Sequence, residues 1–201
     1  MKEIARLVFA LTLIAVVAAL ILSLVEGVTR APIAEQRRLE MLKALAAVLP
    51  PIDNQPDRDS VSLAAGSDRK GRPLQRTFYR GRREGRLAGV AFKVVAPDGY
   101  SGNIEIMVGV DAAGAVTGVE ILAHAETPGL GSRIAEPWFR EQFRGKTLEN
   151  ADWRVKKDGG GFDQITGATI SPRAVVGAVK GGLEFFAGHR AEILAGEEAR
   201  P

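Results

Sequence analysis

The chain has 201 residues, a length that suits one anchor plus one domain or two small domains. Its formal net charge of +3 and 25% charged side chains are ordinary for a globular protein. It has no cysteine and only two histidines, His124 and His189, which excludes disulfides and argues against a histidine- or cysteine-rich metal site. We therefore predict no bound metal and a fold stabilised by packing alone.

An uncharged apolar segment, Leu7 to Val25, lies near the N-terminus. A helix of its 19 residues would span roughly 28 Å, close to the thickness of a bilayer core. The alternative is a cleaved signal peptide, but the residues that follow, 26–30, are unlike a small-residue cleavage site. We expect residues 1–30 to be an uncleaved anchor, and the flanking positive charges weakly favour a cytoplasmic N-terminus.

Residues 31–50 are predicted to form an amphipathic connecting helix, because their apolar side chains recur at helical spacing and Pro50-Pro51 follows. Asp53 to Gly71 is rich in Asp, Ser and Gly, so we expect a loop there. The strands expected after it are Gln75 to Tyr79, Leu87 to Val95, Asn103 to Val110 and Ala115 to Leu122. Short turns join them, notably the hairpin turn at 111–114, which favours an antiparallel meander.

The remaining elements are a short helix at Ile134 to Phe143, a glycine-rich loop at Lys156 to Phe162, and a last helix at Arg173 to Ala187. The predicted fold class is thus α+β: a single N-terminal transmembrane helix followed by a mainly antiparallel sheet with packed helices.

A basic segment runs from Arg69 to Arg86, with eight positive side chains and Glu84 as its only acid. Nucleic-acid binding is one interpretation, but no known binding motif accompanies these charges. We predict a solvated hairpin near anionic lipid or an acidic partner, and no nucleic-acid partner.

A compact turn of small and hydroxyl residues, 166–172, comes directly before the last helix. Ser171 is predicted to be the helix N-cap and Pro172 the first helical residue. Unpaired N–H groups and the helix dipole would favour an anion there, so a phosphate near Thr169 would be well placed. The alternative is an ordinary capped helix start.

Two other loops are candidates for binding. In the loop 124–131, His124 and Glu126 could supply hydrogen bonds or a proton relay, or the loop could be purely structural. In the turn 98–102, Tyr100 could stack on a planar ligand or pack within its own turn. Neither loop has the G-x-G-x-x-G spacing of a dinucleotide site.

Asp163 followed by Thr166-Gly167-Ala168-Thr169 resembles the flavinylation motif of FMN-binding domains: an acid, two residues, then Ser/Thr-Gly-Ala-Ser/Thr. With the segments 99–104, 108–111 and 124–131 and the single anchor, the chain is similar to the G subunit of the Rnf (Rsx) electron-transport complex. The resemblance implies that residues 51–201 form a periplasmic FMN-binding domain. It also implies that FMN is joined through its phosphate to Thr169, as a phosphoester made by a separate flavin transferase from FAD with magnesium.

The candidate flavin-site residues are then Thr169, Thr166, Gly167, Ala168, Asp163, Tyr100, His124, Glu126, Thr127 and Leu130. The resemblance implies a single-pass protein of the bacterial inner membrane that partners the A, B, C, D and E subunits of Rnf. The complex couples electron transfer between NADH and ferredoxin to ion movement, and this chain would relay electrons without being catalytic alone. The alternatives are the C subunit of a sodium-pumping NADH:quinone reductase and a non-redox membrane-anchored binding module.

Overall fold

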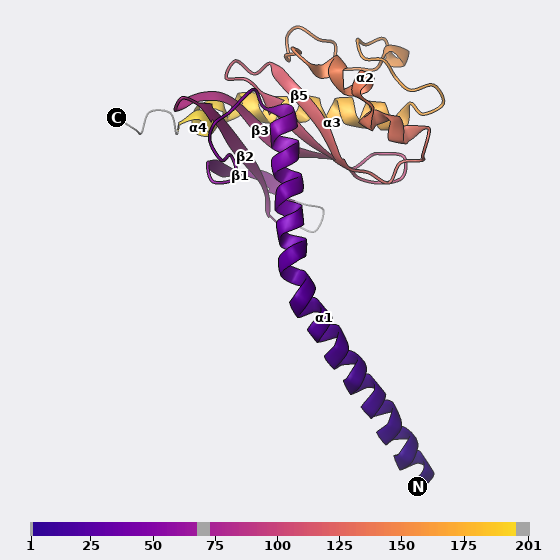
Figure 1. The fold of residues 1–201 in the computed structure, drawn as a ribbon. Coiled ribbons are helices and arrows are strands. Elements are labelled where there is room, and N and C mark those ends of the chain that lie inside the picture. The colour runs from indigo at the N-terminus through magenta and orange to yellow at the C-terminus, as the bar shows by residue number, and fades with distance from the viewer. Residues whose placement is uncertain (1, 68–72, 196–201) are drawn as a thin grey trace. The chain divides into compact units, whose positions relative to one another are not determined.

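The computed structural model describes residues 2–67 and 73–195 (Figure 1). In chain order the elements are α1 (Lys2–Val48), β1 (Ser60–Ser67), β2 (Pro73–Arg83), β3 (Arg86–Ala96), β4 (Ile104–Val110), β5 (Val116–Ala123), η1 (Gly131–Ala135), α2 (Pro137–Arg140), η2 (Glu141–Phe143), η3 (Lys156–Asp158), α3 (Ile170–Gly188) and α4 (Arg190–Leu194). The chain divides into two compact units, Met1–Met41 and Leu42–Pro201, and each is described by itself.

The first unit is helical throughout its described residues, all of which belong to α1. Its large apolar side chains from Ile4 to Val28 are exposed. The Thr12 hydroxyl donates to the carbonyl oxygen of Val8 at 2.8 Å, so even this polar group is satisfied within the helix. By length and composition α1 can cross a membrane, as the apolar segment predicted.

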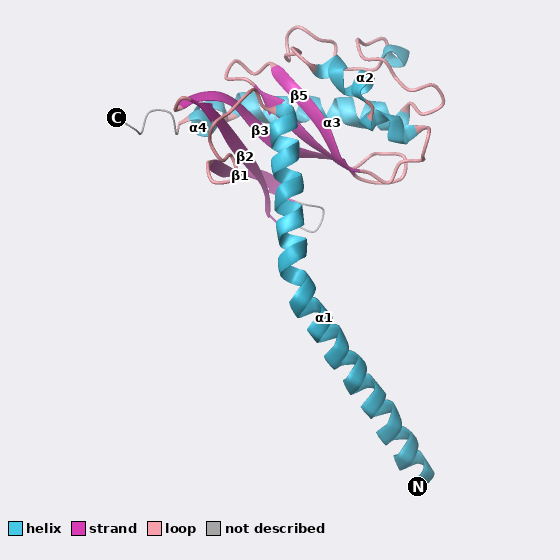
Figure 2. Cartoon of the chain, viewed as in Figure 1, coloured by secondary structure: helices cyan, strands magenta, loops and turns pink. Residues whose placement is uncertain are grey.

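The second unit contains a five-stranded sheet in the order β1-β2-β3-β4-β5, and every neighbouring pair is antiparallel (Figure 2). The predicted α+β class and the four predicted strands are confirmed. The hairpin turn between β4 and β5 is also confirmed: the Asp111 side chain accepts hydrogen bonds from the N–H groups of Ala113 and Ala115, both at 2.9 Å.

The prediction of a continuous loop from Asp53 to Gly71 was wrong, because Ser60–Ser67 is strand β1 (residues 68–71 lie outside the described residues). The polar composition of residues 60–67 concealed their alternation of apolar and polar side chains. Leu63 is buried and Val61 packs against the core, while the serines on either side of Val61 are exposed. Alternation over four residues was the strand signal that composition overrode.

Helix α3 lies against one face of the sheet (Figure 1). Aromatic and branched side chains from both elements form the core between them. The ring of Phe186 on α3 stacks on that of Phe92 on β3, with centroids 6.3 Å apart. Phe92 in turn contacts Phe78 on β2, with centroids at 5.1 Å. Val175 and Val179, also on α3, are fully buried against the same face. This layer fixes where α3 lies and therefore where its first residue lies.

The last turn of α1, which belongs to the second unit, packs on the other face of the sheet. The Thr117 hydroxyl donates to the carbonyl oxygen of Val48 at 2.6 Å. A Cβ at Gly109 would lie 2.2 Å from that same oxygen, so only glycine allows this approach. The end of α1 therefore covers the part of this face around Gly109 and Gly118, whereas Val95 and Leu122 are exposed.

The predicted single helix from Ile134 to Phe143 was only partly right. The structure has a short α2 between two 3₁₀ turns, η1 and η2. Pro137 explains the break, because the residue before a proline avoids helical geometry, and Glu136 is extended with φ −69° and ψ 145°. The loop predicted at Lys156 to Phe162 likewise contains one 3₁₀ turn, η3.

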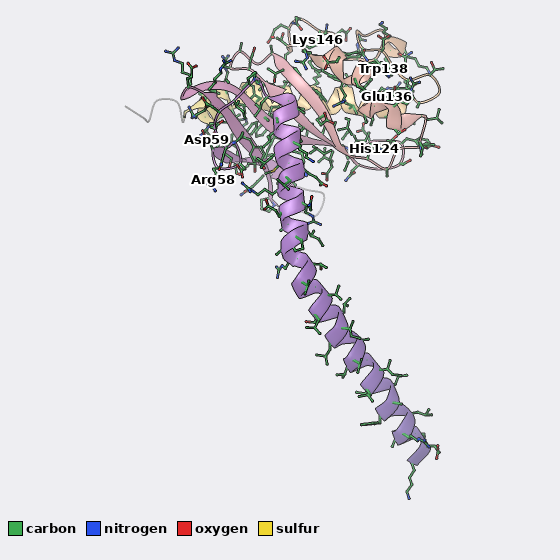
Figure 3. The ribbon with its side chains drawn as sticks, in the orientation of Figure 1. Arg58, Asp59, His124, Glu136, Trp138 and Lys146 are labelled. Atoms are coloured by element: carbon green, nitrogen blue, oxygen red, sulfur yellow. The ribbon has the colours of Figure 1, made fainter. Side chains whose placement is uncertain are left out.

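The basic hairpin matches the prediction of a solvated surface only in part: its turn 83–86 is exposed, whereas Arg80 and Arg82 are part-buried in ion pairs (residues 69–72 lie outside the described part). Arg80 and Arg82 on β2 both bind Asp59, with Arg80 Nη1 at 3.2 Å and Arg82 Nε at 2.6 Å from the carboxylate oxygens. Figure 3 places Asp59 beside the sheet. Burial alone would raise the pKa of Asp59, but the hydrogen bonds and charges of Arg82 and then Arg80 lower it below the ordinary value.

Replacing Asp59 by asparagine should lower the free energy of unfolding at pH 7 by about 1–3 kcal/mol, since two part-buried guanidinium groups lose a charged partner. A lowered folded-state pKa contributes stability that is complete above the ordinary pKa of 3.8 and disappears as the pH falls through the folded value. The difference from the original chain should therefore narrow below about pH 4.

Urea unfolding of both proteins at pH 7, 4 and 3 measures this difference. Glu149→Gln, which alters an exposed loop carboxylate, is the control and should change stability little at any of these pH values. An Asp59→Asn deficit that is absent at pH 7, or that widens in acid, contradicts the assignment.

Candidate functional site

The residues 166–169 form a tight turn between the buried residue Ile165 and the start of α3. Ile165 is 1% exposed, and its carbonyl oxygen accepts a hydrogen bond from the N–H of Ala168 at 3.0 Å. Gly167 turns the chain with φ +80°, and it is exposed, whereas Thr169 is partly exposed. The Thr169 residue therefore lies at the surface of the domain and is not sealed in the core.

The prediction that Ser171 caps the last helix was wrong. Helix α3 begins at Ile170, so Thr169 occupies the N-cap position and Ser171 lies inside the first turn. Ser171 is 1% exposed, and its hydroxyl donates to the Glu126 carboxylate instead of accepting from the backbone. Thr169 makes no side-chain capping bond either, which leaves its hydroxyl uncommitted at the start of a helix.

A buried carboxylate, that of Glu126, joins the three candidate loops. Glu126 is 4% exposed. Its Oε1 accepts from the N–H of Ser101 at 2.9 Å, and its Oε2 accepts from the Ser171 hydroxyl. The turn 98–102, the loop 124–131 and the start of α3 are thus brought together, and Glu126 lies beneath them, away from the exposed surface.

The close packing around this carboxylate requires a glycine at position 131. A Cβ there would lie 2.6 Å from the Ser171 hydroxyl and 2.7 Å from Glu126 Oε2. Both distances are shorter than real Cβ contacts, so any larger residue must displace the Ser171–Glu126 pair.

Two exposed side chains belong to the loops that Glu126 joins to the start of α3. Tyr100 is 69% exposed and Leu130 is 44% exposed. A Cβ at Gly167 would be 3.6 Å from Leu130 Cδ2, which places Leu130 directly beside the turn. Leu130 thus offers an apolar aliphatic group beside the turn, and Tyr100 offers an exposed aromatic ring on the neighbouring loop.

His124 and Thr127 have structural contacts within their own loop, although both are exposed. His124, which lies just beyond β5 in Figure 3, accepts on Nδ1 from the N–H of Glu126 at 3.2 Å. The Thr127 carbonyl oxygen accepts from the N–H groups of Leu130 and Ser132, both at 3.2 Å. These bonds hold the loop in the shape that buries Glu126.

The contacts of Asp163 are with residues other than Thr169. Its carboxylate pairs with Lys156 Nζ at 2.7 Å, and its N–H donates to Gln142 Oε1 at 2.6 Å. A second ion pair, from Arg173 on α3 to Asp158, joins the same glycine-rich loop to the helix start. The hydrogen bond from Arg173 lowers the pKa of Asp158 below its ordinary value.

Two residues of this region were not predicted from the sequence. Ile170 is 43% exposed immediately after Thr169, and its position off the apolar face of α3 was a signal available in the sequence. Trp138 is 40% exposed on α2, where its indole N–H donates to Glu136 (Figure 3). Within the described residues, no three Asp, Glu or His side chains gather as a metal site.

The chemical types of the residues at this turn are compatible with an FMN phosphate and with a flavin ring. Thr169 offers a hydroxyl at a helix start that no side chain caps, and Gly167 and Ala168 leave the backbone beside it uncrowded. Tyr100, Leu130 and Ile170 are exposed apolar or aromatic side chains, which is the kind of group that a flavin ring contacts.

Comparison with known proteins agrees with this geometry. Residues 99–184 match the family described as FMN-binding domain, a span that contains all three loops and most of α3. This match covers less than half of the chain, whereas the chain as a whole is similar to relatives that match it over a longer span. The chain is 45% identical over 197 residues to the G subunit of the ion-translocating oxidoreductase complex of Pseudomonas aeruginosa, covering 94% of this chain and 91% of that protein.

A protein of the same name from Aliivibrio fischeri is 42% identical over 193 residues, covering 92% of this chain and 90% of the relative. The chain belongs to the family formed by the G subunits of ion-translocating oxidoreductase (Rnf) complexes. The crystal structure of NqrC from Shewanella oneidensis has a TM-score of 0.52 at 21% identity, covering 76% of this chain and 74% of that one. This second likeness shows a shared fold alone.

Replacing Gly131 by alanine should destabilise the domain by about 1–3 kcal/mol, because the new Cβ overlaps the Ser171–Glu126 pair. Gly177→Ala is the matched control, since a Cβ there meets nothing within 4 Å and alanine favours the interior of α3 by roughly 0.5–1 kcal/mol. Urea unfolding of the full chain in detergent compares the two. Equal stability of Gly131→Ala and the original chain would show that the loops do not pack as described.

Proposed function

We propose that the chain is a membrane-anchored electron-transfer subunit of an Rnf complex and carries FMN covalently as a phosphoester on Thr169. The observation that carries the proposal is the position of Thr169: partly exposed, uncapped, and at the start of α3 within the span that matches the FMN-binding domain. The membership of the chain in the G-subunit family supports the assignment to the complex.

The local chemistry supports attachment by another enzyme. A threonine hydroxyl is a poor nucleophile and requires a base or a metal ion for activation. Among the described residues no carboxylate or imidazole hydrogen-bonds to the Thr169 side chain, since Glu126 is committed to Ser171 and Ser101. A flavin transferase that supplies this activation, using FAD and magnesium, is therefore the proposed maturation partner.

The chain would hold and orient the cofactor. The N–H groups at the start of α3 would stabilise the single negative charge of the phosphodiester. Tyr100 and Leu130 would contact the ring and exclude water from part of it, and Thr166, Gly167 and Ala168 would leave room for the phosphate. When bound, FMN supplies the electron-accepting and electron-donating chemistry that these side chains lack.

The membrane assignment is part of the same proposal. Helix α1 would be a single span with a cytoplasmic N-terminus, which places the FMN-binding domain in the periplasm of a bacterial inner membrane. Covalent attachment suits that location, since a dissociable flavin would be lost by dilution there. The A, B, C, D and E subunits of Rnf would be the partners in ion-coupled electron transfer between NADH and ferredoxin.

The C subunit of a sodium-pumping NADH:quinone reductase is the weaker alternative. The sequence identity to NqrC is 21%, against 42% and 45% for the G subunits of the oxidoreductase complex. The remaining alternative is a membrane-anchored binding module in which the Thr169 turn merely starts a helix, and the following experiment separates it from the proposal.

We expect the full chain, coexpressed with a flavin transferase, to give a fluorescent flavin band on a denaturing gel. Thr169→Val should lose the band entirely, because valine keeps the shape of threonine but lacks the hydroxyl that forms the ester. Thr77→Val, on β2 and paired with Ser62, is the control and should keep it. Intact mass should rise by FMN minus one water in the original chain and in this control, and not in Thr169→Val.

Two results contradict the proposal in different ways. A band that persists in Thr169→Val places the attachment at another residue. A lack of flavin in both the original chain and Thr169→Val, with active transferase shown on a known substrate, favours the binding-module alternative.

A further inference from the structure

Glu126 is a charged residue buried in a place where the core offers no counter-ion among the described residues. It is 4% exposed, and both its oxygens accept hydrogen bonds from other segments, one from the Ser101 N–H and one from the Ser171 hydroxyl. A buried carboxylate that lost these donors would incur a large desolvation cost. The two bonds therefore hold the turn 98–102 and the start of α3 against the loop 124–131.

The bond between Ser171 and Glu126 helps to fix the backbone that follows Thr169. Ser171 is two residues after Thr169, within the same helical turn, and the turn's own backbone is held on the other side by the bond from Ala168 to Ile165. Thr169 itself makes no capping bond that would fix its side chain. The direction in which its hydroxyl faces thus depends on what holds the backbone around it. Besides these two contacts, the Arg173 N–H donates to the Thr169 carbonyl oxygen at 3.2 Å and the Arg173 side chain pairs with Asp158, but of the two side-chain contacts only the Ser171–Glu126 bond is buried.

We infer that Glu126 is a positioning residue for flavin attachment: acting through Ser171, it holds Thr169 in the orientation that the flavin transferase requires, without touching the flavin. This inference rests on the proposed function, since it assumes Thr169 as the acceptor. The step itself forms a phosphoester between the Thr169 oxygen and the FMN phosphate of FAD. It breaks the pyrophosphate bond, so AMP leaves and the hydroxyl proton is released.

The inference separates the geometry of Glu126 from its charge. Glutamine at position 126 keeps both bonds, because its carbonyl oxygen can accept from Ser101 and its amide can donate to the Ser171 hydroxyl. Alanine removes both bonds. Ser171→Ala removes only the bond to α3 and leaves the Ser101 contact intact. A positioning role predicts that glutamine restores attachment and that the two alanine variants do not.

The test measures transfer kinetics with the purified full chain in detergent, a purified flavin transferase, FAD and magnesium. Partial unfolding lowers the concentration of competent acceptor and so raises the apparent KM for the chain, whereas a misdirected hydroxyl lowers kcat. We expect kcat to fall by about tenfold or more for Glu126→Ala and Ser171→Ala, since small misplacements of a reacting group have effects of that order. Glu126→Gln should stay within about threefold of the original.

Val179→Ala is the control for stability, because Val179 is fully buried in α3 on the sheet side and outside the site. It should lower the melting temperature through a core cavity while leaving kcat unchanged. If Glu126→Ala does not fold, Ser171→Ala and Glu126→Gln carry the test.

The outcomes distinguish this inference from the proposed function. An original chain that receives no flavin at Thr169 overturns both. An original chain loaded at Thr169, together with unchanged kcat for Ser171→Ala and Glu126→Ala, overturns the positioning role alone. A kcat for Glu126→Gln as low as that for Glu126→Ala also overturns it, because the charge and not the geometry would then matter.

Discussion

The hydrogen bonds of one buried carboxylate hold the candidate site together. Glu126 receives a backbone N–H from Ser101 and a hydroxyl from Ser171, which lies 45 residues further along the chain. Because an unpaired buried charge is costly, neither partner can leave without a large loss of free energy. Gly131 makes the arrangement possible by leaving the space that any Cβ would fill. Loops that would otherwise be independent thereby behave as one unit beside Thr169.

The sheet and α3 give this unit a rigid base. Stacking of Phe186 on Phe92 and burial of Val175 and Val179 hold α3 to one face of the sheet. Ile165, buried just before the turn, fixes the approach to the helix from the other direction. Function in such folds is placed on loops supported by rigid elements, and the loops here extend from the ends of β3, β5 and α3.

Sequence patterns predicted most of the sheet and α3, but few of the contacts inside the candidate site. Strong alternation and helical spacing predicted four strands and α3, whereas β1 was missed because serine-rich composition outweighed the alternation around Leu63. The turn carrying Thr169 could be recognised as a short motif. The Ser171–Glu126 bond could not, since residues 45 positions apart become neighbours only through folding. The sequence alone consequently favours a capping role for Ser171, the commonest role for serine before a helix.

The charges around the turn 166–169 suggest a physical reason for a covalent bond to FMN at Thr169. Lys156 on the glycine-rich loop and Arg173 at the start of α3 are already paired with Asp163 and Asp158. A phosphate would have to compete with those carboxylates, and the Glu126 charge lies beneath the same helix start. The N–H groups of α3 stabilise a single negative charge by about 0.3–1 kcal/mol at an exposed helix end, far short of what tight binding requires. In this setting ionic contacts would at most orient a phosphodiester, and the proposed ester to Thr169 would supply the retention that they do not.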